Sequence, residues 1–191
     1  MSLKRVVYTR PDGGVSVVVP APALIMEFQL FGRATGSLLW HGPVLEVPST
    51  ERVLSLADAE VAALAYVRTK NIPRDAINIR EYDDVEFPPT RRFRSAWRQA
   101  GTGPPTVEMP LARRQRMDEV RTERASKLLK SDVDYLRAQE AANLTLQTRL
   151  KDYRQKLRDL PAVEQPNVDA ITTPDALAAW EPTWPIDPIV L

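Results

Sequence analysis

The chain has 191 residues, 43% of them hydrophobic and 27% charged, with a formal net charge of +1. This length suits one ordinary domain, or a small domain with a helical appendage. The absence of cysteine excludes disulfides and thiolate metal sites. The first residues lack the apolar segment of a signal peptide, and no stretch approaches the ~18 apolar residues of a membrane span, so we expect neither.

The near-neutral total hides a strong segregation of charge. Residues 1–90 sum to −2, residues 91–160 to +8 and residues 161–191 to −5. Opposed charges within one chain are more typical of intramolecular pairing or head-to-tail assembly than of a nucleic-acid surface.

The first elements in chain order form a predicted β-hairpin. Residues 5–8 and 15–19 are rich in β-branched side chains and flank Arg10-Pro11-Asp12-Gly13-Gly14. Proline presets φ and the glycines allow positive φ, as a tight turn requires. Residues 24–31 fit either a short helix or a strand, and 37–47 contain two further candidate strands, Ser37 to Trp40 and Val44 to Val47.

A helix and a strand complete the first part of the chain. Ser55, followed three residues later by Asp58, resembles a capping box and predicts a helix through about Lys70. Apolar and polar residues then alternate over 77–82, as in a half-buried strand. We therefore expect residues 1–90 to form a small α+β domain.

The middle of the chain predicts a basic helical hairpin over residues 91–160. After a Gly/Pro linker at 101–105, the chain contains no Gly or Pro for 50 residues beyond Pro110, which is a favoured first helical residue. Asn143 is the weakest point because Asn tolerates the left-handed region or caps a new helix. We expect helices at about 110–141 and 144–160, as an antiparallel hairpin or one kinked rod.

The last segment, residues 161–191, predicts an extended acidic tail. It contains six prolines, two tryptophans and no Lys or Arg. Pro161 is expected to end the preceding helix, since it lacks the N–H that the helix needs. Thr173 to Trp180 reads as a short capped helix. The predicted fold class is thus α+β: a small N-terminal hairpin-plus-helix domain, then a helical hairpin and a Pro/Trp-rich extended tail.

The sequence offers no catalytic constellation. The single histidine, His41, lacks a nucleophile and an orienting carboxylate in any known motif. Asp83, Asp84 and Glu86 lack the spacing of a calcium loop. We expect no enzyme, no catalytic residue, no metal site and no cofactor.

A basic, aromatic run is the best nucleic-acid candidate. Aromatic rings between arginines can stack on bases while guanidinium groups hold phosphates. The alternative, which we favour, is that Phe93 and Trp97 pack inward as a helical pair while the arginines face water or acids. The candidate arginines are Arg91, Arg92, Arg94 and Arg98.

The two tail tryptophans, Trp180 and Trp184, have two interpretations of equal weight. Tryptophan and proline supply contact area at low entropic cost, as at binding hot spots. Alternatively, both rings fold back onto the helical hairpin.

Three strings in the last third carry a family resemblance. These are Leu128-Leu129-Lys130-Ser131-Asp132, Tyr153-Arg154-Gln155 with Leu157-Arg158-Asp159-Leu160-Pro161, and Trp184-Pro185. They resemble the small phage tail assembly chaperone domain of tailed phages and prophages. Upstream, Phe93 to Trp97 and Met109 to Arg113 resemble phage proteins of unknown role encoded near tail genes.

The resemblance implies protein–protein contact within phage tails. The leading hypothesis is a non-enzymatic tail protein of the virion, attached in the tail tip, baseplate or tail-fibre region. The alternatives are a tail-fibre assembly chaperone in the cytoplasm of the infected bacterium, and a small nucleic-acid-binding protein. The implied partners are other phage tail proteins, with a homo-oligomer as a further option. The residues expected to contact a partner are Tyr153, Arg154, Trp180, Trp184 and Pro185.

Overall fold

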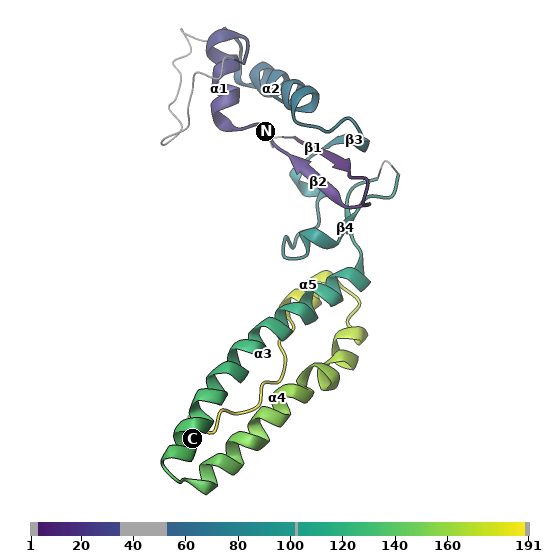
Figure 1. Cartoon of the computed structure of the whole chain (residues 1–191). Coiled ribbons are helices and arrows are strands. Elements are labelled where there is room, and N and C mark those ends of the chain that lie inside the picture. Colours follow the sequence, from purple (N-terminus) through teal and green to yellow (C-terminus); the bar gives the residue numbers. More distant parts are fainter. Residues whose placement is uncertain (1–3, 35–52, 102, 190–191) are drawn as a thin grey trace. The chain divides into compact units, whose positions relative to one another are not determined.

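The computed structural model describes residues 4–34, 53–101 and 103–189 (Figure 1). The chain divides into two compact units. Unit 1 contains residues 1–89 and 97–106, and unit 2 contains residues 90–96 and 107–191. Together they confirm the predicted α+β class.

Unit 1 contains a three-stranded antiparallel sheet in the order β2-β1-β3. The strands are β1 (Arg5–Thr9), β2 (Val15–Val18) and β3 (Ile77–Tyr82). The predicted hairpin is confirmed, with Val7 opposite Val17. Gly13 has φ 78°, and the Asp12 carboxylate accepts a hydrogen bond from the Gly14 N–H at 2.8 Å. That bond lowers the pKa of Asp12 and fixes the turn.

Two helices, α1 (Pro22–Phe31) and α2 (Leu56–Lys70), pack in unit 1. Residues 24–31 are therefore helical, which the sequence left open. The Ser55 cap is confirmed: its hydroxyl accepts from the Asp58 N–H. Their shared core consists of Ile25, Phe28, Ala59 and Ala63. The expected strands at 37–47 and His41 lie outside the described residues.

Short elements follow the sheet. They are the 3-10 turns η2 (Asp84–Glu86) and η3 (Arg94–Ala96) and a two-stranded sheet of β4 (Trp97–Arg98) and β5 (Thr106–Val107). Phe93 and Trp97 are both fully buried. They do not form the expected pair, because Phe93 belongs to the core of unit 2 while Trp97 contacts Phe87 in unit 1.

Unit 2 is the predicted antiparallel helical hairpin. It contains α3 (Met109–Glu140), α4 (Leu144–Ala170) and the short α5 (Pro174–Ala179). Ala142 takes a positive φ of 50°. The Asn143 side chain then caps α4 by accepting from the Leu146 N–H at 3.0 Å, so the chain reverses at the predicted point.

The expected end of the second helix at Leu160 is wrong, because α4 continues through Pro161 and Pro166 to Ala170. Each proline removes one helical hydrogen bond. Long-range packing outweighs this loss: Val168 is fully buried in a cluster with Ala112, Met117 and Leu177. Tertiary contacts of this kind regularly override local propensity.

Candidate partner-binding site

The apolar seam of the unit 2 hairpin thins towards the end of α3. On α4 the buried side chains include Leu150, Leu157 and Leu160, and on α3 they include Met117 and Val120. Further along α3 the buried positions are polar or small: Ser131, Asp134 and Ala138. Two helices with so few large residues leave part of their shared surface to be covered by a third segment.

That third segment is the C-terminal tail. Residues 180–189, here called the strap, run lengthwise along the hairpin from α5 towards the α3–α4 turn (Figure 1). The interpretation that both tail tryptophans fold back on the hairpin is the one that the structure shows. Trp180 packs against the core cluster of unit 2, and the Lys127 ammonium lies 4.7 Å from the Trp184 ring centroid.

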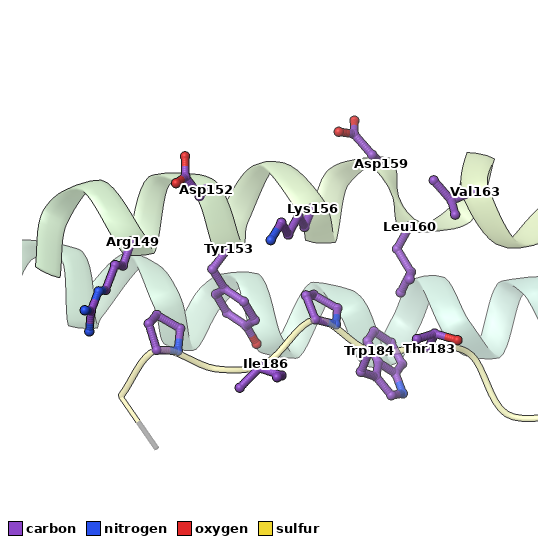
Figure 2. Close-up of a pocket in the computed structure, with 12 residues that line it drawn as sticks. Arg149, Asp152, Tyr153, Lys156, Asp159, Leu160, Val163, Thr183, Trp184 and Ile186 are labelled. Atoms are coloured by element: carbon purple, nitrogen blue, oxygen red, sulfur yellow. The ribbon is translucent and has the colours of Figure 1, made fainter. Parts of the chain in front are cut away.

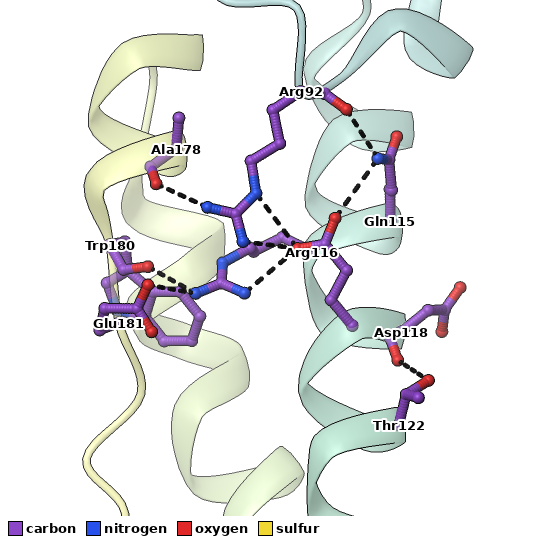
Figure 3. A network of polar contacts seen from close by, with 9 residues as sticks. Arg92, Gln115, Arg116, Asp118, Thr122, Ala178, Trp180 and Glu181 are labelled. Carbon is purple, nitrogen blue, oxygen red and sulfur yellow. Dashed lines mark hydrogen bonds and ion pairs between the residues drawn. The ribbon is translucent and has the colours of Figure 1, made fainter.

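A buried arginine holds the start of the strap (Figure 3). Only 4% of the Arg116 side chain is exposed. It pairs with Glu119 at 3.2 Å and with Glu181 at 3.1 Å, and it donates to the Trp180 carbonyl at 2.8 Å. The guanidinium also lies 5.3 Å from the Trp180 ring centroid. A buried cation requires such partners, since desolvation is costly.

Glu164 holds the middle of the strap. The residue is 3% exposed, and its carboxylate accepts from the Thr183 N–H at 2.9 Å and from the Asn167 amide at 2.7 Å. Glu164 lies in the part of α4 that continues past Pro161. The helix extension therefore supplies a strap contact that a helix ending at Leu160 would lack.

Lys130 holds the end of the strap. It donates to Asp187 at 2.8 Å and to Asp134 at 3.1 Å, and these hydrogen bonds raise the pKa of Lys130. Partial burial alone would raise the pKa of Asp187, but the Lys130 and Ile189 hydrogen bonds outweigh burial, so this pKa lies below its ordinary value. Burial, followed by the nearby Asp187 charge, raises the pKa of Tyr153.

Three of the five predicted contact residues meet in one groove, and two do not (Figure 2). Tyr153, Trp184 and Pro185 line an open groove of about 730 Å³ between α4 and the strap. Arg154 instead forms an ion pair with Asp132 of α3. Trp180 contacts Arg116, as described above. The remaining lining residues are Arg149, Asp152, Lys156, Asp159, Leu160, Val163, Thr183, Ile186 and Pro188.

The arginines predicted for nucleic acid serve partly internal roles. Arg92 pairs with Glu119 at 2.7 Å and donates to the Ala178 carbonyl at 2.9 Å (Figure 3). Arg91, Arg92 and Arg94 belong to unit 2 and Arg98 to unit 1. A shared nucleic-acid surface for these four residues stays a prediction.

Sequence reasoning missed the charged residues that hold the strap, namely Arg116, Glu164, Lys130 and Asp187. Each would read as an ordinary surface residue on a helix or in a loop. The available signal was the opposed charge of residues 91–160 and 161–191, which indicated pairing between the two segments without naming the pairs.

A comparison with known families identifies this same region. Residues 117–188 match the family model described as phage tail assembly chaperone protein. The match covers most of α3, all of α4 and α5, and the strap through Pro188. No curated protein and no solved structure matches the chain. The resemblance stated from the sequence is confirmed for this C-terminal part, and it supports a non-enzymatic role connected with phage tails.

Within the described residues, no helix is both long and apolar enough to cross a membrane, and no cluster of three or more His, Cys, Asp or Glu is arranged to hold a metal ion.

Proposed function

We propose that this protein is a non-enzymatic phage tail assembly chaperone that binds an unassembled tail protein through unit 2. The observation that carries the proposal is the overlap of the family match with the strapped hairpin. The match begins at Met117, beside the buried Arg116, and ends at Pro188 in the strap. The matched segment thus lies within unit 2 and includes most of the hairpin and the strap, so we expect the contact on the surface of this unit.

An exposed apolar stripe on α3 is the surface that we assign to the tail protein. It consists of Leu129, Val133 and Leu136, which are 70%, 45% and 57% exposed. Their spacing of i, i+4 and i+7 places them on one face of the helix. Single exposed apolar residues are ordinary, but several on one face mark a contact surface. An assembly chaperone needs such a face to cover apolar surface on a subunit that has not yet joined its neighbours.

Co-expression with the tail-fibre protein of the same phage tests this proposal in the bacterial cytoplasm. The full chain is expected to raise the soluble fraction of the fibre protein when present at less than equal amounts. The double variant Leu129→Asp with Leu136→Asp should lose this effect, because two charges would be placed in an apolar contact. The matched control is Leu144→Asp, which alters a leucine that is 73% exposed and lies outside the stripe.

An unchanged soluble fraction of the fibre protein with the full chain would contradict a fibre chaperone. Equal loss of effect in the stripe variant and the Leu144→Asp control would contradict the assignment of the stripe.

The virion role ranked first in the sequence analysis is the second candidate. The observation in its favour is the strap, which is attached to the hairpin of its own chain. Unit 2 therefore needs no partner to cover the strap and can remain attached to a tail as a folded unit. Mass spectrometry of purified virions separates the two roles. A chaperone is expected to be absent from the particle, and a tail component is expected at a fixed copy number.

A further inference from the structure

A charged stripe, here called the α4 stripe, runs along the exposed face of α4. It consists of Arg149, Asp152, Lys156 and Asp159, which are all exposed. Their spacing of three, four and three residues places them on one helix face, with charges that alternate in sign. In Figure 2, Asp152 and Asp159 point away from the strap, while Arg149 and Lys156 lie on the side nearer to it.

Ion pairs to this stripe are missing from the residues that the structure describes. None of Arg149, Asp152 and Lys156 forms an ion pair with another residue in the described part of the chain. Asp152 and Lys156 remain apart although their i, i+4 spacing would permit a pair. Asp159 accepts hydrogen bonds from the Gln155 amide at 2.9 and 3.1 Å. By contrast, Arg116, Lys130 and Arg154 each have a carboxylate partner on the strap or on α3.

The charges of the α4 stripe are complementary to those of an identical stripe that runs in the opposite direction. Arg149 and Asp159 lie five residues on either side of Arg154, and Asp152 and Lys156 lie two residues on either side. An antiparallel helix that places an opposite charge against each residue of the stripe must carry the charges +, −, + and − from its own N-terminus, at the same spacing. The stripe of α4 has this order of charges. A parallel helix of the same sequence would place like charges opposite each other.

We propose that α4 binds α4 of a second copy of this chain in an antiparallel, two-fold symmetric contact. The symmetry axis passes through the stripe between Asp152 and Lys156, at the level of Arg154 but on the opposite side of the helix. Each Arg149 faces Asp159 of the second copy, and each Asp152 faces Lys156 of the second copy. A two-fold contact uses the same patch on both copies, so it requires a self-complementary pattern of this kind.

The expected dimer is weak and sensitive to salt. Exposed ion pairs contribute little individually and are screened by ions. Val163 and Ile186, which are 64% and 73% exposed, line the same groove and supply some apolar area at its edge. The α4 stripe does not include the α3 residues assigned to the tail protein, so the dimer stands or falls independently of the proposed function.

Sedimentation equilibrium of the full chain at low salt tests the dimer by charge reversal. The wild type is expected to dimerise in the range of about 100 µM, and added salt should weaken the dimer. Arg149→Asp places two acids opposite each other at both ends of the contact, and Asp159→Arg places two bases there. Each variant alone should dimerise at least about tenfold more weakly.

Mixing the two variants gives the decisive result. In a mixed dimer, the new Asp at 149 faces the new Arg at 159, and the unchanged Asp159 faces the unchanged Arg149, so association should return. Arg158→Asp is the control, since it alters an exposed charge of α4 outside the stripe. Circular dichroism of each variant confirms that the helices are retained.

The proposal is overturned by a wild type that stays monomeric at low salt. It is also overturned by a mixture that associates no better than its separate components, or by a control that weakens the dimer as much as Arg149→Asp.

Discussion

Both units of this chain have apolar clusters, but unit 2 also attaches its final segment through charged contacts. In unit 1, the sheet and helix α2 pack together through apolar clusters such as the one formed by Val6, Leu64 and Val67. Unit 2 has an apolar cluster around Met117 and Val168, but its final segment is attached by ion pairs, hydrogen bonds and cation–π contacts from residues such as Arg116 and Lys130. Apolar clusters tolerate changes of pH and salt, whereas an electrostatic attachment can be loosened while the helices remain. The strap of unit 2 is therefore the segment that is expected to respond first to changes of salt.

The largest expected loss of stability follows from a substitution in the apolar seam between α3 and α4. Leu157 is fully buried between the helices, so Leu157→Ala should lower the free energy of unfolding of unit 2 by about 2–5 kcal/mol. Leu64→Ala in unit 1 is the matched substitution, with Leu64 6% exposed. Chemical denaturation followed by circular dichroism measures both. If Leu157→Ala were neutral, the hairpin would not be packed as described.

The next effect is expected at the buried arginine. Arg116→Met keeps the apolar stem but removes the charge that meets Glu119, Glu181 and the Trp180 carbonyl. Because both glutamates are partly exposed, the loss should be about 1–3 kcal/mol, below that of a fully buried pair. Denaturation monitored by tryptophan fluorescence measures this loss. Arg114→Met, at an exposed position of the same helix turn, should leave stability within about 0.5 kcal/mol.

A smaller effect is expected at the centre of the strap. Glu164→Ala leaves the Thr183 N–H without its acceptor, which should cost about 1–2 kcal/mol. The same change should speed amide hydrogen exchange in residues 180–189 while exchange in unit 1 stays unchanged. Unaltered exchange in the strap would show that Glu164 does not hold it.

The smallest expected effect is that of pH on the attachment of the strap. The pKa of Asp187 lies below its ordinary value of 3.8, so its contribution is present above that pH and is lost as pH falls further. The pKa of Lys130 lies above its ordinary value of 10.5, so its contribution is present below that pH and is lost at higher pH. Strap attachment should therefore be constant between about pH 5 and pH 10 and weaken outside this window by about 1 kcal/mol or less.

The NMR signal of the Trp184 indole N–H reports strap attachment directly. A transition of this signal near neutral pH would contradict the assignment of Asp187 and Lys130 as the groups that hold the end of the strap.

Local signals explain why much of the fold was predictable. The Pro11 to Gly14 turn, the Ser55 cap and the break at Asn143 each depend on residues within a few positions of one another, and the structure confirms all three. Pro161 misled because its local preference competes with the burial of Val168, whose partners lie elsewhere in the chain. Tertiary packing decides whether the helix ends at the proline or continues, and these long-range contacts cannot be read from a single sequence.

The candidate site was less predictable for the same reason. The Arg116 and Trp180 contact joins residues 64 positions apart, and nothing near either residue indicates the other. The sequence therefore identified aromatic residues of the tail as contact residues but left open whether the contact lay inside the chain. The observed strap uses Trp180 and Trp184 internally and leaves the α3 stripe of Leu129, Val133 and Leu136 exposed.

Cross-linking mass spectrometry in infected cells tests the central claim, that unit 2 contacts a phage tail protein, most directly. Lys127 lies two residues before Leu129 on α3 and Lys130 directly after it, so they are suitable attachment points for a lysine-reactive reagent. The account predicts cross-links from these two lysines to a tail protein, and their loss in the Leu129→Asp with Leu136→Asp variant. Cross-links confined to this chain would contradict the account.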